Sequence, residues 1–229
     1  MNNSFRTADA GAALRKNKFP GFGTLVGLSK NGKYAVVACF YTGKSDEDRN
    51  VKFNDFGDEV MLMPRIAGQP MGERALVSSP VKKSGQKVFV NDGSLTDLLC
   101  EASESGKCCV GALCGLEASK KTRVGGIVCL GEKFSYKLFC VKPADEAASA
   151  NNAMIFSFSP VAGVGHLVTE FGKDKKPFSG EPARVTVLNN SESFTEKLWK
   201  SLGDDRAALV VRYISLSSGR VTTRMRGLD

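Results

Sequence analysis

The chain reads Gly23-Thr-Leu-Val-Gly-Leu28, Ser29-Lys-Asn-Gly-Lys33 and Tyr34-Ala-Val-Val-Ala-Cys-Phe-Tyr41 across two β-rich runs and the turn between them. Asn31 and Gly32 both tolerate positive φ, so this dipeptide predicts a tight β-hairpin. The second run is apolar at nearly every position, which is typical of a strand buried on both faces. The hairpin therefore predicts an antiparallel sheet inside the protein.

Further β-rich runs follow, and helical patterns interrupt them in only a few places. We expect strands at 59–63, 87–90, 126–130, 134–141, 152–159, 165–171, 183–188 and 208–215, with a tight turn at 131–133. We expect helices at 94–105, capped by Ser94 and Asp97, at 108–118 and at 193–202. The charged segment 43–54 and the Pro-, Gly- and Ser-rich segment 64–85 are predicted to be surface excursions.

This order of elements predicts an α+β protein with antiparallel sheets covered by a few helices. No regular strand-helix alternation or sequence repeat is visible, which disfavours Rossmann and TIM-barrel architectures. A chain of 229 residues fits one large domain, or at most two small ones. We expect residues 19–229 to form that domain, preceded by a polar helix or tether over residues 1–18.

The composition favours an anionic small-molecule partner. The formal charge of +8 suits a nucleotide, a nucleic acid or a phosphorylated metabolite. Basic residues form no block of five or more and do not interleave with aromatic residues, so nucleic-acid binding is not expected. A solvated basic surface explains the charge equally well.

Cysteine usage and hydropathy predict a cytoplasmic protein. The seven cysteines are odd in number and form no Cys-x-x-Cys, which favours reduced thiols. With one histidine and irregular cysteine spacing, no metal site is expected. No apolar run approaches the roughly 20 residues that span a bilayer, and residues 1–18 lack the apolar centre of a signal peptide.

Several motifs combine glycine with charged residues, and their order is specific. They are Phe19-Pro-Gly-Phe-Gly23, Gly43-Lys-Ser-Asp-Glu-Asp-Arg-Asn50, Gly163-Val-Gly-His-Leu-Val-Thr-Glu170 and Lys175-Lys-Pro-Phe-Ser-Gly-Glu-Pro182. Tyr136-Lys-Leu138, Leu198-Trp199 and Val211-Arg-Tyr213 complete the set. Together they resemble the bacterial branch of the IMP cyclohydrolase family of archaeal type, over most of the chain.

This resemblance implies an activity and a finer fold. The activity is closure of a formamido-imidazole-carboxamide ribotide to IMP with release of water, in purine nucleotide biosynthesis. The fold is a four-layer αββα sandwich like that of N-terminal-nucleophile hydrolases, although no processing nucleophile follows Met1. Ring closure needs an anchored phosphate, reacting groups held face to face and a proton for the departing water. It demands no metal or organic cofactor.

Substrate binding is expected of polar residues in two loops and one strand. Lys44 and Ser45 offer an ammonium group and a hydroxyl after a buried strand, and Arg49 and Asn50 add a guanidinium and an amide. A turn that opens a helix, and a polar pair in an apolar strand, supply the other candidates: Asp92, Thr96, Asp97, Tyr136 and Lys137. A solvated charged loop and ordinary helix capping are the alternative explanations.

Proton transfer and oxyanion stabilisation are expected of Glu117, Arg123 and His166. The resemblance aligns Glu117 and Arg123 with an acidic residue and a Thr-Pro-Arg segment, and His166 is the only imidazole. A surface ion pair and a structural histidine are the alternatives. Convergence of Lys44, Glu117, Lys137 and His166 in one pocket would favour an enzyme, whereas scatter would favour binding without catalysis.

Four positions depart from the family pattern. Phe22, Cys39, Phe40 and Val51 stand where relatives carry arginine or tyrosine, and each replacement removes a donor or a cation. Loss of three cations would weaken the binding of an anion by several kcal/mol, at about 1.5–3 kcal/mol each. Two alternatives stay open: a member that binds purine nucleotides or a protein without catalysis, and the same scaffold with a changed cyclisation or amide-hydrolysis substrate. A homo-oligomer is also left open.

Overall fold

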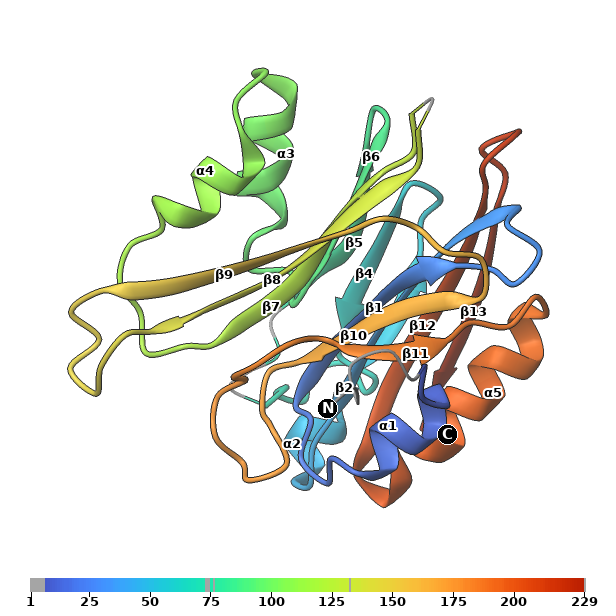
Figure 1. The fold of residues 1–229 in the computed structure, drawn as a ribbon. Coiled ribbons are helices and arrows are strands. Elements are labelled where there is room, and N and C mark those ends of the chain that lie inside the picture. The colour runs from blue at the N-terminus through green and yellow to red at the C-terminus, as the bar shows by residue number, and fades with distance from the viewer. Residues whose placement is uncertain (1–6, 73–74, 76, 132, 229) are drawn as a thin grey trace, which may run out of the picture.

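The computed structural model describes residues 7–72, 75, 77–131 and 133–228 (Figure 1). This part of the chain contains two antiparallel sheets, of six and seven strands, and five α-helices. The predicted α+β class with antiparallel sheets is therefore confirmed. Residues 1–6 of the expected tether and Glu132 of the expected turn at 131–133 lie outside the described residues.

The six-stranded sheet is built around the predicted hairpin. Its spatial order is β11-β10-β1-β2-β12-β13. In chain order, its strands are β1 (Phe22–Leu28), β2 (Tyr34–Thr42), β10 (Val164–Thr169), β11 (Ala183–Thr186), β12 (Arg206–Ser215) and β13 (Val221–Gly227). Every residue of β2 except Tyr34 is buried, because β1 and β12 flank it and both of its faces are covered. The expectation of burial on both faces is confirmed.

The seven-stranded sheet is a meander in which neighbours in sequence are neighbours in space. Its strands are β3 (Lys52–Asp55), β4 (Glu59–Met63), β5 (Ser78–Ser84), β6 (Lys87–Asn91), β7 (Arg123–Cys129), β8 (Ser135–Pro143) and β9 (Asn151–Phe158). The connection from β6 to β7, residues 92–122, contains two helices. These helices pack on the outer side of this sheet.

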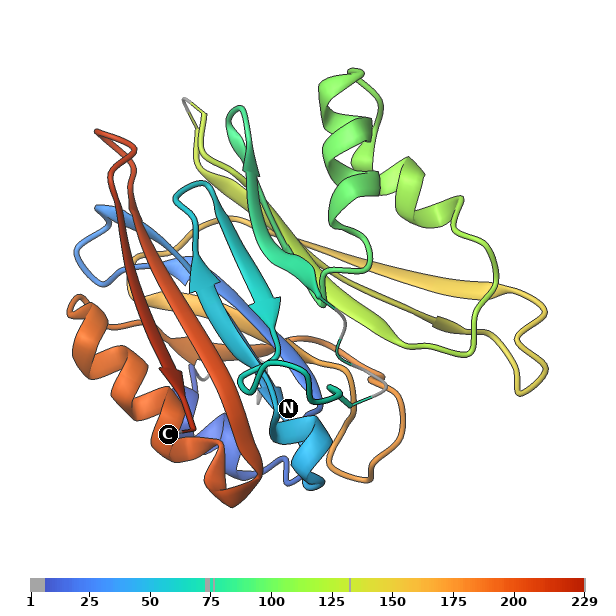
Figure 2. The ribbon, with the colours of Figure 1, turned by 180° about the vertical axis from the view of Figure 1, so that it is seen from behind.

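The two sheets face each other, and helices cover their outer sides (Figure 2). Val37 of the first sheet and Val128 of the second belong to the apolar cluster between the sheets. Helices α1 (Ala10–Arg15) and α5 (Ser191–Ser201) cover the six-stranded sheet. Helices α3 (Thr96–Glu104) and α4 (Cys109–Cys114) cover the seven-stranded sheet, and α2 (Asp46–Arg49) follows β2.

Three segments are more ordered than their sequence indicated. Segment 43–54, expected to be a loop, contains α2 and most of β3; segment 64–85 contains β5; and 221–227 forms the unexpected strand β13. These strands carry mixed polar and apolar residues, so partner strands rather than their own pattern stabilise them. The helix expected at 108–118 is shorter and ends at Cys114, before Gly115.

The expected capping of the helix at 94–105 is wrong. Helix α3 has no side-chain cap from Ser94 or Asp97. Instead, Asn91 Oδ1 accepts hydrogen bonds from the backbone N–H groups of Gly93 and Leu95, at 2.7 and 3.3 Å. The hydroxyl of Ser94 donates to Asp92 Oδ1 at 2.5 Å. The buried Asn91 therefore sets the turn between β6 and α3.

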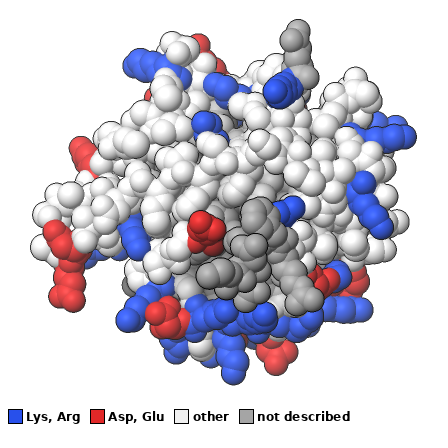
Figure 3. Space-filling view, viewed as in Figure 1, with Lys and Arg blue, Asp and Glu red and all other residues white. Residues whose placement is uncertain are grey.

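The surface charge is uneven (Figure 3). Lys and Arg side chains gather at the lower end of this view, where α1 and α2 lie, while the middle of the same face is mostly uncharged. Hollows at that end are lined by Arg15, Lys18, Lys44, Lys173 and Lys175. Carboxylates line the same hollows, among them Asp48, Asp174 and Asp205, so an anion there meets cations and acidic groups side by side.

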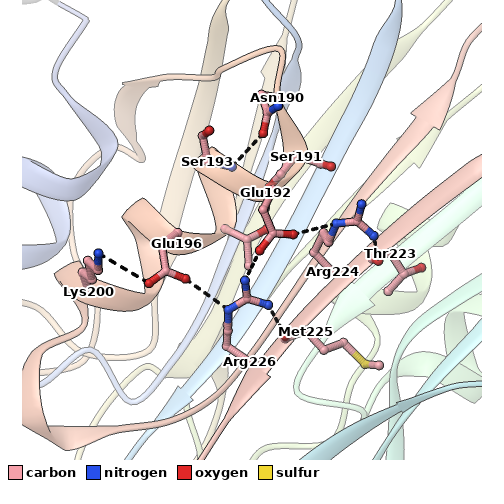
Figure 4. A network of polar contacts seen from close by, with 11 residues as sticks. Asn190, Ser191, Glu192, Ser193, Glu196, Lys200, Thr223, Arg224, Met225 and Arg226 are labelled. Carbon is pink, nitrogen blue, oxygen red and sulfur yellow. Dashed lines mark hydrogen bonds and ion pairs between the residues drawn. The ribbon is translucent and has the colours of Figure 1, made fainter.

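Ion pairs join the edge strand β13 to helix α5 (Figure 4). Glu192 accepts from Arg224 Nε at 2.8 Å and also pairs with Arg226. Arg226 Nε donates to Glu196 at 3.1 Å. These side chains are partly exposed, so each pair contributes little alone, but together they cover one edge of the sheet.

We expect Leu198→Ala to destabilise the protein by about 2–5 kcal/mol, because the side chain is 1% exposed and packs between α5 and the sheet. Urea unfolding measures this change. Lys200→Ala on the exposed side of the same helix is the control, with an expected change within about 0.5 kcal/mol. Equal effects of the two substitutions would contradict the packing of α5 as a covering layer.

Candidate functional site

A narrow cleft lies at one end of the two sheets, where β1 and β7 begin and β2, β6 and β10 end. We call it the inner cleft; its volume is about 70 Å³. Its polar lining comes from segments far apart in sequence and includes Tyr41, Asp48, Asp92, Ser94, Lys121 and Glu170. The meeting of five strand ends gathers these side chains at one place.

A wider depression, which we call the outer hollow, adjoins the inner cleft. The two share Gly21, Thr42 and Asp48. The outer hollow has a volume of about 330 Å³, within the range of small-molecule pockets. Its other lining residues include Phe19, Lys44, Phe171, Lys175 and Asp205. A ligand with an anionic end can therefore place that end among ammonium groups and its remainder toward the inner cleft.

Gly21 allows the chain to pass close to Glu170 at the cleft. Its φ is +66°, and an added Cβ would lie 2.4 Å from Glu170 Oε2. The same carboxylate oxygen accepts a hydrogen bond from the backbone N–H of Phe22 at 3.2 Å. Glycine is required here both by the left-handed backbone and by this contact. The predicted Phe19–Gly23 motif thus shapes the cleft through its backbone.

Asp92 is the carboxyl group best suited to hold a proton in the inner cleft. Burial raises its pKa above the ordinary value, while the hydrogen bonds from Ser94 and the charges of Arg123 and Lys121 act in the opposite direction. Its Oδ1 accepts from the N–H of Ser94 at 3.0 Å, and its backbone carbonyl accepts from the Tyr41 hydroxyl at 2.9 Å. These bonds hold the carboxyl group at the cleft.

Some of the residues predicted from the sequence lie at or beside this site. Lys44 lines the outer hollow, with Nζ 3.8 Å from Asp205, and Asp92 lines the inner cleft. Arg123 begins β7 next to lining residues, and its Nη2 donates to Ser119 at 3.4 Å. Ser45 caps α2 by accepting from the N–H of Asp48 at 3.1 Å, and half-buried Arg49 ends that helix.

Three expected substrate-binding residues are engaged within the fold instead. The buried Asn50 donates to the carbonyls of Gln69 and Pro70 at 3.1 and 3.0 Å, so its amide holds a loop. The buried Thr96 donates to the carbonyl of Ser79 at 2.6 Å. Asp97 is exposed on α3, 3.6 Å from Lys82 Nζ. None of the three is among the residues that line the inner cleft or the outer hollow.

Tyr136 and His166 form a bridge between the sheets. The Tyr136 hydroxyl lies 2.7 Å from His166 Nδ1, and the imidazole stacks on Phe158 with ring centroids 3.6 Å apart. Burial, assisted by the positive charge of Arg184, lowers the pKa of His166 to about 4, and burial raises the pKa of Tyr136. At neutral pH the hydroxyl therefore donates to a neutral imidazole. This geometry matches the structural role that the sequence left open for His166.

Lys137 and Glu117 point elsewhere. Lys137 pairs with Ile127, which packs with α3 and α4, so it lies on the opposite face of the sheet from Tyr136. Glu117 is exposed, and its backbone carbonyl accepts from Asn151 at 2.8 Å. Lys44, Glu117, Lys137 and His166 therefore do not converge. Of these four, the structure places only Lys44 beside the cleft.

The departures from the family pattern face different parts of the protein. Phe22, Cys39 and Val51 belong to the apolar cluster between the sheets, and the rings of Phe22 and Tyr41 are 5.0 Å apart. Phe40 faces the opposite way and packs beneath α1 and α5. Cations at the first three positions would point between the sheets, whereas one at position 40 would not.

Sequence reasoning did not select several residues that line the site, among them Tyr41, Lys121, Glu170 and Lys175. Glu170 is the last residue of the quoted Gly163–Glu170 motif, but the sequence does not show that it lies beside Gly21 and Phe22. Nothing near Lys121 in the sequence distinguishes it from other surface lysines. Only the meeting of distant segments in space distinguishes these residues.

Comparison with known proteins leaves the family open. No protein-family model matches the chain, and no curated protein gives a significant match. The resemblance to IMP cyclohydrolases therefore stays a prediction. Among the described residues, no group of three or more His, Cys, Asp or Glu is arranged to hold a metal ion, and no helix there is long and apolar enough to cross a membrane. All seven cysteines are free thiols.

We expect His166 to make the protein less stable as the pH falls. Its folded pKa of about 4 lies below the ordinary 6.5, so the unfolded chain binds a proton that the folded protein does not. Stability should decrease between about pH 6.5 and pH 4. His166→Gln does not titrate, so its urea midpoint should fall less over this interval. Parallel curves for the two proteins would show that His166 is not held neutral.

Proposed function

We propose that the chain is an IMP cyclohydrolase-like enzyme of the cytoplasm. It closes a formamido-imidazole-carboxamide ribotide to IMP with release of water, a step of purine nucleotide biosynthesis. One observation carries the proposal: a narrow cleft that holds a carboxyl group of raised pKa adjoins a hollow lined by two lysines. A ribotide has matching parts, a planar ring that reacts and a phosphate that anchors it.

The motif resemblance and the layering support the same proposal. We assign the fold to the four-layer αββα sandwich type of N-terminal-nucleophile hydrolases. In support, helices cover the outer side of each sheet and the inner sides pack together. The candidate site at one end of the paired sheets suits this assignment.

In the proposed complex, Lys44 binds the phosphate in the outer hollow and the imidazole ring enters the inner cleft beside Tyr41. Ammonium-phosphate hydrogen bonds are charge-assisted and strong. Holding the formamide against the carboxamide converts ring closure into a well-oriented step within one bound molecule. Residues that position the substrate therefore supply much of the rate enhancement.

Asp92 is the proposed proton donor. The carboxamide nitrogen attacks the formyl carbon, a C–N bond forms, and one proton of that nitrogen passes to the formyl oxygen, which becomes a hydroxyl. That hydroxyl takes a proton from the Asp92 carboxyl group and leaves as water, a C=N bond forms to the former formamido nitrogen, and the proton of that nitrogen returns to the Asp92 carboxylate. Burial favours the protonated acid in the free protein, which is the form that this step needs.

A second candidate is a protein that binds purine nucleotides without catalysis. A specific observation favours it: Glu117 and His166, two of the residues expected to transfer protons, lie outside the inner cleft and the outer hollow. Under this alternative, Lys44 still binds phosphate. The two candidates differ in turnover alone.

We expect Asp92→Asn to lower kcat for ring closure by about 100-fold, because the amide cannot donate an acidic proton. KM should change little, since the substitution is nearly isosteric. Ultraviolet absorbance of the IMP formed follows the reaction. Asp97→Asn, on exposed α3, is the matched control and should keep wild-type kcat. Equal activity of both variants would remove Asp92 from the mechanism.

Lys44→Ala should raise KM for the ribotide and weaken IMP binding by about tenfold or more, through loss of a charge-assisted hydrogen bond. Calorimetry measures IMP binding directly. Binding of IMP that depends on Lys44, without turnover by the wild-type protein, would select the second candidate. Absence of both turnover and binding would refute both.

A further inference from the structure

Lys175 occupies an unusual backbone conformation beside the outer hollow. Its φ is +63°, in the left-handed region of backbone conformation that residues other than glycine and asparagine seldom adopt. The turn is closed by hydrogen bonds from the N–H of Lys175 to the carbonyl of Gly172, at 3.1 Å, and from the N–H of Gly172 to the carbonyl of Lys176, at 2.8 Å. Such positions persist where the surrounding structure holds them, and they are frequent at ligand-binding sites.

This turn directs the lysine toward an aromatic ring. Lys175 Nζ lies 4.0 Å from the centroid of the Phe19 ring, and Lys44 Nζ lies 4.7 Å from the same centroid. The two ammonium groups can therefore be no farther apart than the sum of these distances. Contact with the ring stabilises each cation and orients it without neutralising its charge.

The segments that carry Phe19 and Lys175 are tied together. Asn17 Oδ1 accepts from the N–H of Phe19 at 3.1 Å, and Asn17 Nδ2 donates to the carbonyl of Phe171 at 2.7 Å. Asn17 thus links the chain before β1 to the chain after β10. The arrangement of ring and lysines is preorganised, which lowers the entropy lost when a ligand binds.

The two lysines differ in their existing partners. Lys44 Nζ lies 3.8 Å from Asp205 Oδ2, and the Lys44 side chain is 66% exposed. Solvent-exposed ion pairs of this kind contribute little free energy because water screens them. Lys175 forms no ion pair with any carboxylate of the described residues. Two cations near one ring repel each other, and an anion with two or more charged oxygens placed between them removes that repulsion. A phosphate monoester carries such oxygens, whereas a carboxylate carries a single charge.

We propose that Lys175, Phe19 and Lys44 form a subsite for the dianion of a phosphate monoester. Lys175 and Lys44 donate to different phosphate oxygens, and contact with the Phe19 ring orients both ammonium groups. Identification of that ester as a ribotide rests on the proposed function. The subsite supplies cationic charge to a site in which Phe22, Cys39 and Val51 supply none.

The test compares IMP with inosine, which lacks the phosphate, by calorimetry on the full chain at low salt. Lys175→Ala should weaken IMP binding by about tenfold and leave inosine binding unchanged. Lys175→Arg should restore most of the affinity. Phe19→Leu keeps apolar volume but removes the ring quadrupole, so it should weaken IMP binding to a smaller extent.

Lys173→Ala is the matched control. It removes an exposed lysine from the same segment, one that does not line the outer hollow, and should bind IMP as the wild type does. Equal IMP affinity of Lys175→Ala and Lys173→Ala would overturn the subsite, as would equal loss of IMP and inosine. Failure of the wild type to bind either IMP or ribose phosphate would also overturn it. A phosphate-dependent loss in Lys175→Ala without ring closure would refute the proposed enzyme and retain the subsite.

Discussion

The apolar cluster between the two sheets is the interaction on which the rest of this structure depends. Strand β2 lies at its centre, buried along nearly its whole length, and apolar residues from both sheets interlock with it. A polar group buried in such a cluster costs free energy unless it is hydrogen-bonded. Tyr136 and His166 satisfy that constraint because one donates to the other across the gap. The same burial that holds the sheets together therefore keeps the only imidazole neutral.

The candidate site lies where that cluster ends. Beyond Phe22 and Tyr41 the strands end and polar residues replace apolar ones. Backbone N–H groups there donate hydrogen bonds that fix the acidic side chains in place. The N–H of Phe22 holds Glu170, and Ser94 holds Asp92. The site is thus built on the ends of rigid strands, which position side chains more accurately than free loops do. Its outer part is lined by Lys44 and Lys175, and Lys and Arg side chains gather at the lower end of the face shown in Figure 3.

The fold was predictable where the apolar pattern is dense and not where it is mixed. The hairpin of β1 and β2, strands β8 and β12 and helix α5 all lie close to their predicted positions. Strands β3, β5 and β13 were missed because Lys, Ser, Thr and Arg interrupt their patterns, and pairing with a neighbour decides their conformation. Of the residues that line the candidate site, Lys44 and Asp92 were among those predicted, because each follows a buried strand in a turn-rich segment.

The sequence by itself determined the α+β class, the antiparallel hairpin and the presence of polar residues at strand ends, because these depend on periodicity and turn chemistry. The sequence did not determine which face of a strand packs against the other sheet. Strand alternation places Tyr136 and Lys137 on opposite faces, yet only sheet packing turns Tyr136 to His166 and Lys137 to the helices. Tertiary structure likewise brings Lys175 to Phe19, since contacts between distant segments depend on the arrangement of the sheets and leave no local pattern in the sequence.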